Sequence, residues 1–276
     1  MYIVCTSTSL VTVVGPIRML DGEADEPRTL LPPAESAPRS LIVFLGALVT
    51  PTVVLGFTIL HSVWLTFLSL YYLWVVAPSV VCLSWPGSRQ RMAHALQRGL
   101  RRWRLQALLA LLAIPVLIGT TLLTFHLFAP PLGLSPKRLQ PGLGIFGLTP
   151  AHWASDVGAL TWLTFLNPLM EEAFWRLFIF NSLWIETPSA WARWWAPALA
   201  TSVLYASYHV PVILNFLPVV LVMVGFVFLV AFGVMLQLVV ERYGLILAVG
   251  VHLAGDAAVS LIVTDMLWKW GLTARL

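Results

Sequence analysis

The sequence predicts an all-α, polytopic membrane protein, a bundle of about seven transmembrane helices (six to eight). The 276 residues are 59% hydrophobic, with a mean hydropathy of +0.88, and only 10% of them are charged. Soluble domains carry about one quarter charged residues, so a water-soluble globular fold is excluded. In addition, residues 40–88 and 194–240 contain no Asp, Glu, Lys or Arg. Each stretch is long enough for two spans of about 20 residues.

The N-terminal part divides into a tail and a first group of spans. Residues 1–40 include a stretch rich in acidic residues and proline, which is typical of an exposed, irregular tail. Residues 41–130 are expected to hold three membrane helices. The first two meet at a turn near His61, and the third is interrupted by Pro115, which membrane helices tolerate.

A basic loop at residues 85–104 sets the predicted orientation. Six of the 16 Lys and Arg residues fall between Arg89 and Arg104. Such a cluster beside membrane spans marks the cytoplasmic side and does not call for a nucleic-acid partner. The N-terminus is then predicted inside, and the 131–154 loop and the C-terminus outside. We expect an integral protein of a bacterial inner (plasma) membrane.

The remaining spans contain the polar residues that indicate a function. The fourth span is expected over 156–180, two more within 194–240, and the seventh over 245–267. Glu171 and Glu172 lie inside the fourth span, where a carboxylate is costly unless it is paired or lines a wet cavity. At ~1.5 Å per residue, Glu171, His209 and His252 all fall in the inner to middle part of the bilayer and could share one cavity.

Helical spacing assigns different roles to the two glutamates. Glu172 and Arg176 are spaced i, i+4, so they can pair, and Glu172 is expected to support the arginine. Glu171 lies about 100° round the helix and lacks that partner, which makes it the candidate general base. Pro168 removes a backbone donor and is expected to open the helix just before the site.

Two further i, i+4 pairs lie on separate spans. Tyr205 can pack beside or hydrogen-bond to His209, and Asp256 can orient His252. Together these groups suit activation of a water and stabilisation of an oxyanion. Membrane proton-relay transporters also collect Glu and His, so a transporter remains an alternative. The sequence contains neither His-Glu-x-x-His nor Gly-x-Ser-x-Gly.

These residues resemble the signature of the CAAX-protease and bacteriocin-processing family of intramembrane peptidases, also called the type II CAAX prenyl endopeptidase or lysostaphin-resistance-protein-like family. Its motif Glu-Glu-x-x-x-Arg is matched by Glu171, Glu172 and Arg176. Phe-x-x-x-His is matched by Tyr205 to His209 with tyrosine in place of phenylalanine, and His-x-x-x-Asn/Asp by His252 and Asp256.

The resemblance implies a protease core over residues 150–268, in which four motif-bearing helices enclose a cavity. It further implies peptide-bond hydrolysis in a membrane-associated protein or peptide. Glu171 and His209 would activate water, and His252 with Asp256 would stabilise the oxyanion. The cofactor stays open: a divalent metal such as zinc on Glu171, His209 and His252, or a metal-free glutamate mechanism. A non-catalytic immunity or scaffold protein is a further alternative.

Overall fold

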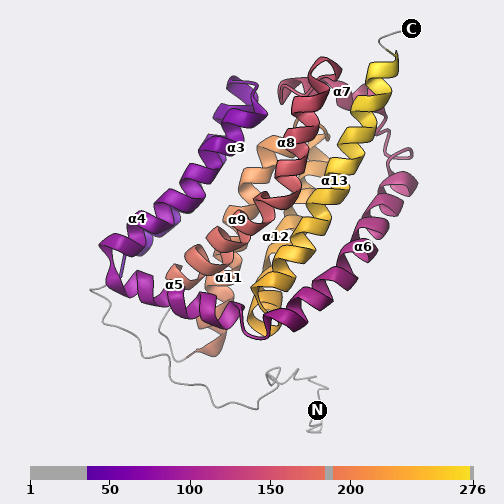
Figure 1. Cartoon of the computed structure of the whole chain (residues 1–276). Coiled ribbons are helices and arrows are strands. Elements are labelled where there is room, and N and C mark those ends of the chain that lie inside the picture. The colour runs from indigo at the N-terminus through magenta and orange to yellow at the C-terminus, as the bar shows by residue number, and fades with distance from the viewer. Residues whose placement is uncertain (1–35, 184–188, 274–276) are drawn as a thin grey trace, which may run out of the picture.

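The computed structural model describes residues 36–183 and 189–273, and in these residues it contains helices and no strands (Figure 1). The predicted all-α, polytopic bundle is therefore confirmed. The expected tail, residues 1–40, lies outside the described residues except for its last five. Membrane helices satisfy their backbone hydrogen bonds within one segment, which explains why so apolar a chain is almost entirely helical.

The N-terminal half contains three long helical rods, with a further helix between the second and the third and a shorter one after them. The elements are α1 (Arg39–Ala47), α2 (Val49–Val53), the π-helical η2 (Val54–Ile59), α3 (Val63–Tyr71), the π-helical η3 (Tyr72–Val76), α4 (Ala77–Ser84), α5 (Pro86–Gly99), α6 (Trp103–Phe128) and α7 (Pro136–Ile145). The expected turn near His61 is present: His61 has a left-handed backbone with φ 48°, and Ser62 caps α3 by accepting from the Leu65 amide.

The C-terminal half holds the motif-bearing helices. They are the 3₁₀ turn η4 (Pro150–His152), α8 (Trp153–Phe165), α9 (Asn167–Glu172), the π-helical η5 (Ala173–Ile179), α10 (Phe180–Leu183), α11 (Ala190–Ile213), α12 (Val219–Arg242) and α13 (Leu245–Thr273).

Five helices in the described part are long and apolar enough to cross a membrane. They coincide with five of the expected spans: Arg39–Ile59, Val63–Ser84, Trp103–Phe128, Val219–Arg242 and Leu245–Gly271. The two other expected spans correspond to α8–α10 and α11, which are helical but carry internal prolines and the polar motifs. The total number of crossings stays a prediction.

Two segments expected as loops, the second with a short surface helix, pack more closely into the bundle than the sequence indicated. The basic loop at 85–104 is mostly the helix α5, which contacts α10, α12 and α13. The external loop contains α7, whose Leu139 and Leu143 are buried in the main core. Figure 1 shows α5 at one end of the bundle, and α7 with the C-terminal end of α13 at the other. This arrangement agrees with placing the two segments on opposite sides of a membrane.

Helix α13 is the central element that brings the motifs together. It packs against α6, α8, α9 and α12, while α11 packs against α12 and α2. Helices α13 and α6 approach closely at Gly250, where an added Cβ would lie only 2.6 Å from the Ala110 Cβ of α6. Small residues allow this approach between membrane helices. The contact of α13 with α9 places the third motif beside the first.

Candidate active site

The first motif sits directly after a break in the fourth expected span. Helix α8 ends at Phe165, Leu166 forms a turn, and α9 restarts at Asn167 with Pro168 in its first turn. The predicted opening at Pro168 is confirmed. Proline fits the first turn of a helix because the backbone donor it lacks has no intrahelical partner there.

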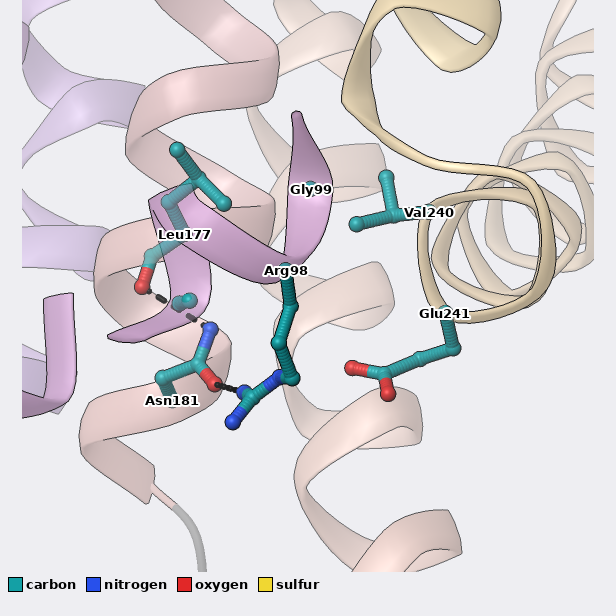
Figure 2. Close-up of a pocket in the computed structure, with 7 residues that line it drawn as sticks. Arg98, Gly99, Leu177, Asn181, Val240 and Glu241 are labelled. Carbon is teal, nitrogen blue, oxygen red and sulfur yellow. Dashed lines mark hydrogen bonds between the residues drawn. The ribbon is translucent and has the colours of Figure 1, made fainter. Parts of the chain in front are cut away.

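After Glu172 the helix widens into the π segment η5, which carries Arg176. Such π segments are rare and often occur at functional sites. The Asn181 amide donates to the carbonyls of Arg176 at 2.9 Å and Leu177 at 3.0 Å. Arg98 of α5 donates in turn to Asn181 Oδ1 at 3.4 Å, beside a small pocket that Glu241 also lines (Figure 2). Helix α5 thus contacts α10, which directly follows the segment that carries the first motif.

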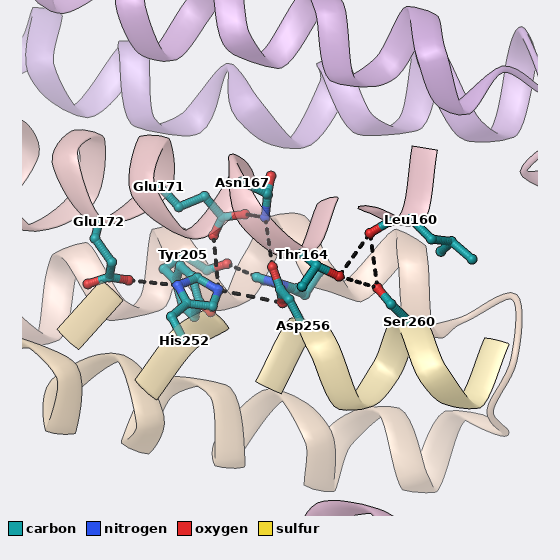
Figure 3. A network of polar contacts seen from close by, with 10 residues as sticks. Leu160, Thr164, Asn167, Glu171, Glu172, Tyr205, His252, Asp256 and Ser260 are labelled. Atoms are coloured by element: carbon teal, nitrogen blue, oxygen red, sulfur yellow. Dashed lines mark hydrogen bonds and ion pairs between the residues drawn. The ribbon is translucent and has the colours of Figure 1, made fainter. Parts of the chain in front are cut away.

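Glu172 connects two of the three motifs. Its Oε2 accepts from Arg176 Nε at 3.2 Å, and its Oε1 accepts from His252 Nδ1 at 2.9 Å (Figure 3). Glu172 and Arg176 are fully buried. The guanidinium of Arg176 also lies over the Tyr205 ring, 5.0 Å from its centroid. The predicted Glu172–Arg176 pair is therefore present, and Glu172 has a second partner that helical spacing did not indicate.

Glu171 faces the other ring nitrogen of His252 from the one that Glu172 binds (Figure 3). Its Oε1 accepts a short hydrogen bond from Asn167 Nδ2, and its Oε2 is 3.8 Å from His252 Nε2. Only 2% of Glu171 is exposed, and its buried Oε2 has no hydrogen bond within 3.5 Å among the described residues, although the Tyr208 hydroxyl lies near the same carboxyl group. This oxygen is therefore free to accept a proton from a bound molecule.

His252 is the residue on which the acidic groups converge. Since its Nδ1–H donates to Glu172, its other nitrogen, Nε2, faces Glu171, Asp256 and the Tyr205 hydroxyl. Asp256 Oδ1 lies 3.8 Å from Nε2. The predicted His252–Asp256 pair is thus present, but Glu172 is the closer partner and fixes the orientation of the ring.

Tyr205 and His209 pack together on α11, as their spacing predicted. Their ring centroids are 4.7 Å apart. His209 Nδ1 donates to the Tyr205 carbonyl at 2.9 Å, while the Tyr205 hydroxyl lies 3.5 Å from His252 Nε2. Because Nδ1 is the donor, Nε2 of His209 carries the lone pair in the neutral ring.

The acidic residues and His252 form one connected group, but His209 is joined to neither glutamate. In the part of the chain that the structure describes, His209 donates a hydrogen bond to the Tyr205 carbonyl, and its ring packs on the rings of Tyr205 and Tyr208. The same residues contain no group of three or more His, Cys, Asp or Glu side chains placed to hold a metal ion. The possible metal set of Glu171, His209 and His252 does not fit this arrangement.

Several residues near the site were not predicted. Asn167 donates to both Glu171 and Asp256, and its i, i+4 spacing from Glu171 was the available signal. Tyr208 is buried, and its ring stacks on Trp175 with centroids 5.9 Å apart. Tyr71 comes from α3, and its buried hydroxyl lies near Trp162 and Glu171. No motif in the sequence marked either tyrosine.

Comparison with known proteins identifies one family. Residues 153–258 match the family model described as type II CAAX prenyl endopeptidase Rce1-like. The match covers α8 to α13 as far as Ala258, and so contains all three motifs. No curated protein and no solved structure matches the chain.

Proposed function

Because residues 153–258 match the model of the Rce1-like type II CAAX prenyl endopeptidase family, we propose that the chain is an intramembrane endopeptidase that hydrolyses a peptide bond of a membrane-associated protein or peptide. The observation that carries the proposal is the convergence at His252. Glu172 lies 2.9 Å from one ring nitrogen, and Glu171 and Asp256 each lie 3.8 Å from the other. A structural ion pair needs only one carboxylate.

In this proposal Glu171 is the general base. Its Oε2 takes a proton from water as the water oxygen bonds to the scissile carbonyl carbon. The same carboxyl group then gives that proton to the leaving nitrogen, and the C–N bond breaks. The free position of Oε2, with Oε1 held by Asn167, supports this assignment. His209 assists Glu171 in activating the water through the lone pair on its Nε2.

In this proposal His252 stabilises the developing oxyanion by donating a hydrogen bond to it. With Nδ1–H held by Glu172, the imidazolium form presents Nε2–H toward the space between Glu171 and Asp256. A buried donor aimed at the oxyanion is worth about 10²–10³ in rate in other hydrolases. Glu172 and Arg176 act as positioning residues, since Glu172 holds the His252 ring and Arg176 neutralises Glu172.

The proposal is tested with the purified full chain in lipid vesicles. Two peptides of the same sequence ending in a CAAX motif are compared, one prenylated on its cysteine and one not. Mass spectrometry should detect loss of the last three residues, faster from the prenylated peptide. Cleavage of both at equal rates would leave a peptidase without prenyl recognition, whereas cleavage of neither would contradict the proposed reaction on CAAX-type substrates.

A further inference from the structure

Asn167 bridges two carboxylates at the centre of the site. Its Nδ2 donates to Glu171 Oε1 in a short hydrogen bond and to Asp256 Oδ2 at 3.3 Å (Figure 3). The three side chains come from two helices, since Asn167 and Glu171 belong to α9 and Asp256 to α13. Only 5% of Asn167 is exposed.

The chemistry of the groups fixes the direction of these hydrogen bonds. An ionised carboxylate only accepts, whereas an amide NH₂ has two donor hydrogens. The amide nitrogen must therefore face both acids, and it can supply one hydrogen to each. A carbonyl oxygen in that place would leave two buried carboxylates facing an acceptor.

The Asn167 bridge stabilises Glu171 and Asp256, two acids that both face Nε2 of His252. Glu171 Oε2 and Asp256 Oδ1 are each 3.8 Å from His252 Nε2. Because the two carboxyl groups also share the Asn167 amide, they are neighbours and repel when both are ionised. Asn167 binds the other oxygen of each carboxyl group. This leaves Glu171 Oε2 facing His252 and fixes the rotation of the Glu171 carboxylate.

The start of α9 gives this placement. Leu166 forms the turn, so Asn167 stands at the first position of a new helix, one turn before Glu171. A residue at that spacing lies on the same face as Glu171 and points toward α13. Pro168 holds the restart in place.

We propose that Asn167 is a positioning residue of the peptidase: its amide clamps Glu171 to Asp256 and so aims the Glu171 oxygen that takes the proton from water. The inference rests on the proposed function for its kinetic readout. No motif of the resemblance includes this position. Misplacing a catalytic group by about 1 Å can cost 10²-fold in rate.

The test uses Asn167→Asp, which keeps size and shape but replaces the donor by a third carboxylate. We expect kcat to fall by about 100-fold with KM changed less than about threefold, because the substrate is still bound but the base is misdirected. Adding Asp256→Asn returns an amide to the cluster and removes one charge. The double variant should therefore regain about tenfold over Asn167→Asp.

The matched control is Asn215→Asp. Asn215 lies two residues after the end of α11, and its side-chain amide donates to the Pro211 carbonyl, away from the acidic cluster. It should retain the wild-type kcat. The clamp is refuted if Asn167→Asp keeps the wild-type kcat, or if Asp256→Asn gives no recovery. Should the wild-type chain cleave no peptide, the proposed function fails. The clamp is then judged by melting temperature, which should fall in Asn167→Asp and recover in the double variant.

Discussion

Glu172 and His252 are hydrogen-bonded across two helices, with Oε1 of Glu172 2.9 Å from Nδ1 of His252. This bond joins the first motif on α9 to the third on α13 and leaves the other ring nitrogen facing Glu171. The second oxygen of Glu172 binds Arg176 at 3.2 Å. The same residue therefore fixes both the buried arginine and the orientation of the candidate oxyanion donor.

The first prediction concerns this double role. Glu172→Gln should lower the stability of the folded protein by about 3 kcal/mol, because removing one partner of a buried pair leaves the other charge uncompensated. Thermal unfolding in detergent, together with the yield of membrane-inserted protein, measures the effect. Adding Arg176→Met should recover part of the loss. An unchanged melting temperature in Glu172→Gln would show that the pair has no structural role.

A second prediction separates the ring of Tyr205 from its hydroxyl. Tyr205→Phe should keep peptidase activity within about threefold of wild type, since the lost hydrogen bond to His252 is long, at 3.5 Å. The ring would still pack on Arg176 and His209. Tyr205→Ala removes those contacts and should cost both activity and stability. Steady-state kinetics and melting curves of the two variants decide this, and inactivity of a stably folded Tyr205→Phe would assign the hydroxyl a direct part in the reaction.

The third prediction is the orientation in the membrane. Gln97 in α5 and Lys137 in α7 are both exposed, and the two helices lie at opposite ends of the bundle. The test replaces Cys5 and Cys82 by serine and introduces a single cysteine at position 97 or at position 137. A membrane-impermeant thiol reagent applied to intact cells should label position 137 and not position 97. Labelling of both from the same side would contradict the span count.

The sequence was sufficient to predict the helical bundle, because charge-free stretches of 40–50 residues leave few alternatives to membrane helices. The pairing of Glu172 with Arg176, the packing of Tyr205 on His209 and the break at Pro168 also followed from local spacing. Each of these relationships lies within about one helical turn, where geometry is fixed by the helix itself.

Contacts between helices could not be predicted in the same way. The hydrogen bond from His252 to Glu172 and the bridge from Asn167 to Asp256 join residues 80 and 89 positions apart. They depend on how α13 packs against α9, a contact between helices that lie far apart in the sequence. The burial of α7 and the helical form of α5 likewise depend on tertiary packing, which overrides the polar, proline-containing sequence of both segments.

The central claim is that Glu171 takes the proton from the attacking water, and its most direct test compares wild type, Glu171→Gln and Glu171→Asp in water enriched in ¹⁸O. The wild-type chain in vesicles should release a peptide whose new C-terminal carboxyl group carries ¹⁸O. We expect Glu171→Gln to release no detectable product, and Glu171→Asp nearly none, because the base must be placed within about 0.5 Å. Both variants should retain the wild-type melting temperature within a few degrees. A transporter would tolerate Glu171→Asp, and a scaffold would tolerate loss of the carboxylate altogether. Labelled product at the wild-type rate from stably folded Glu171→Gln would contradict the account.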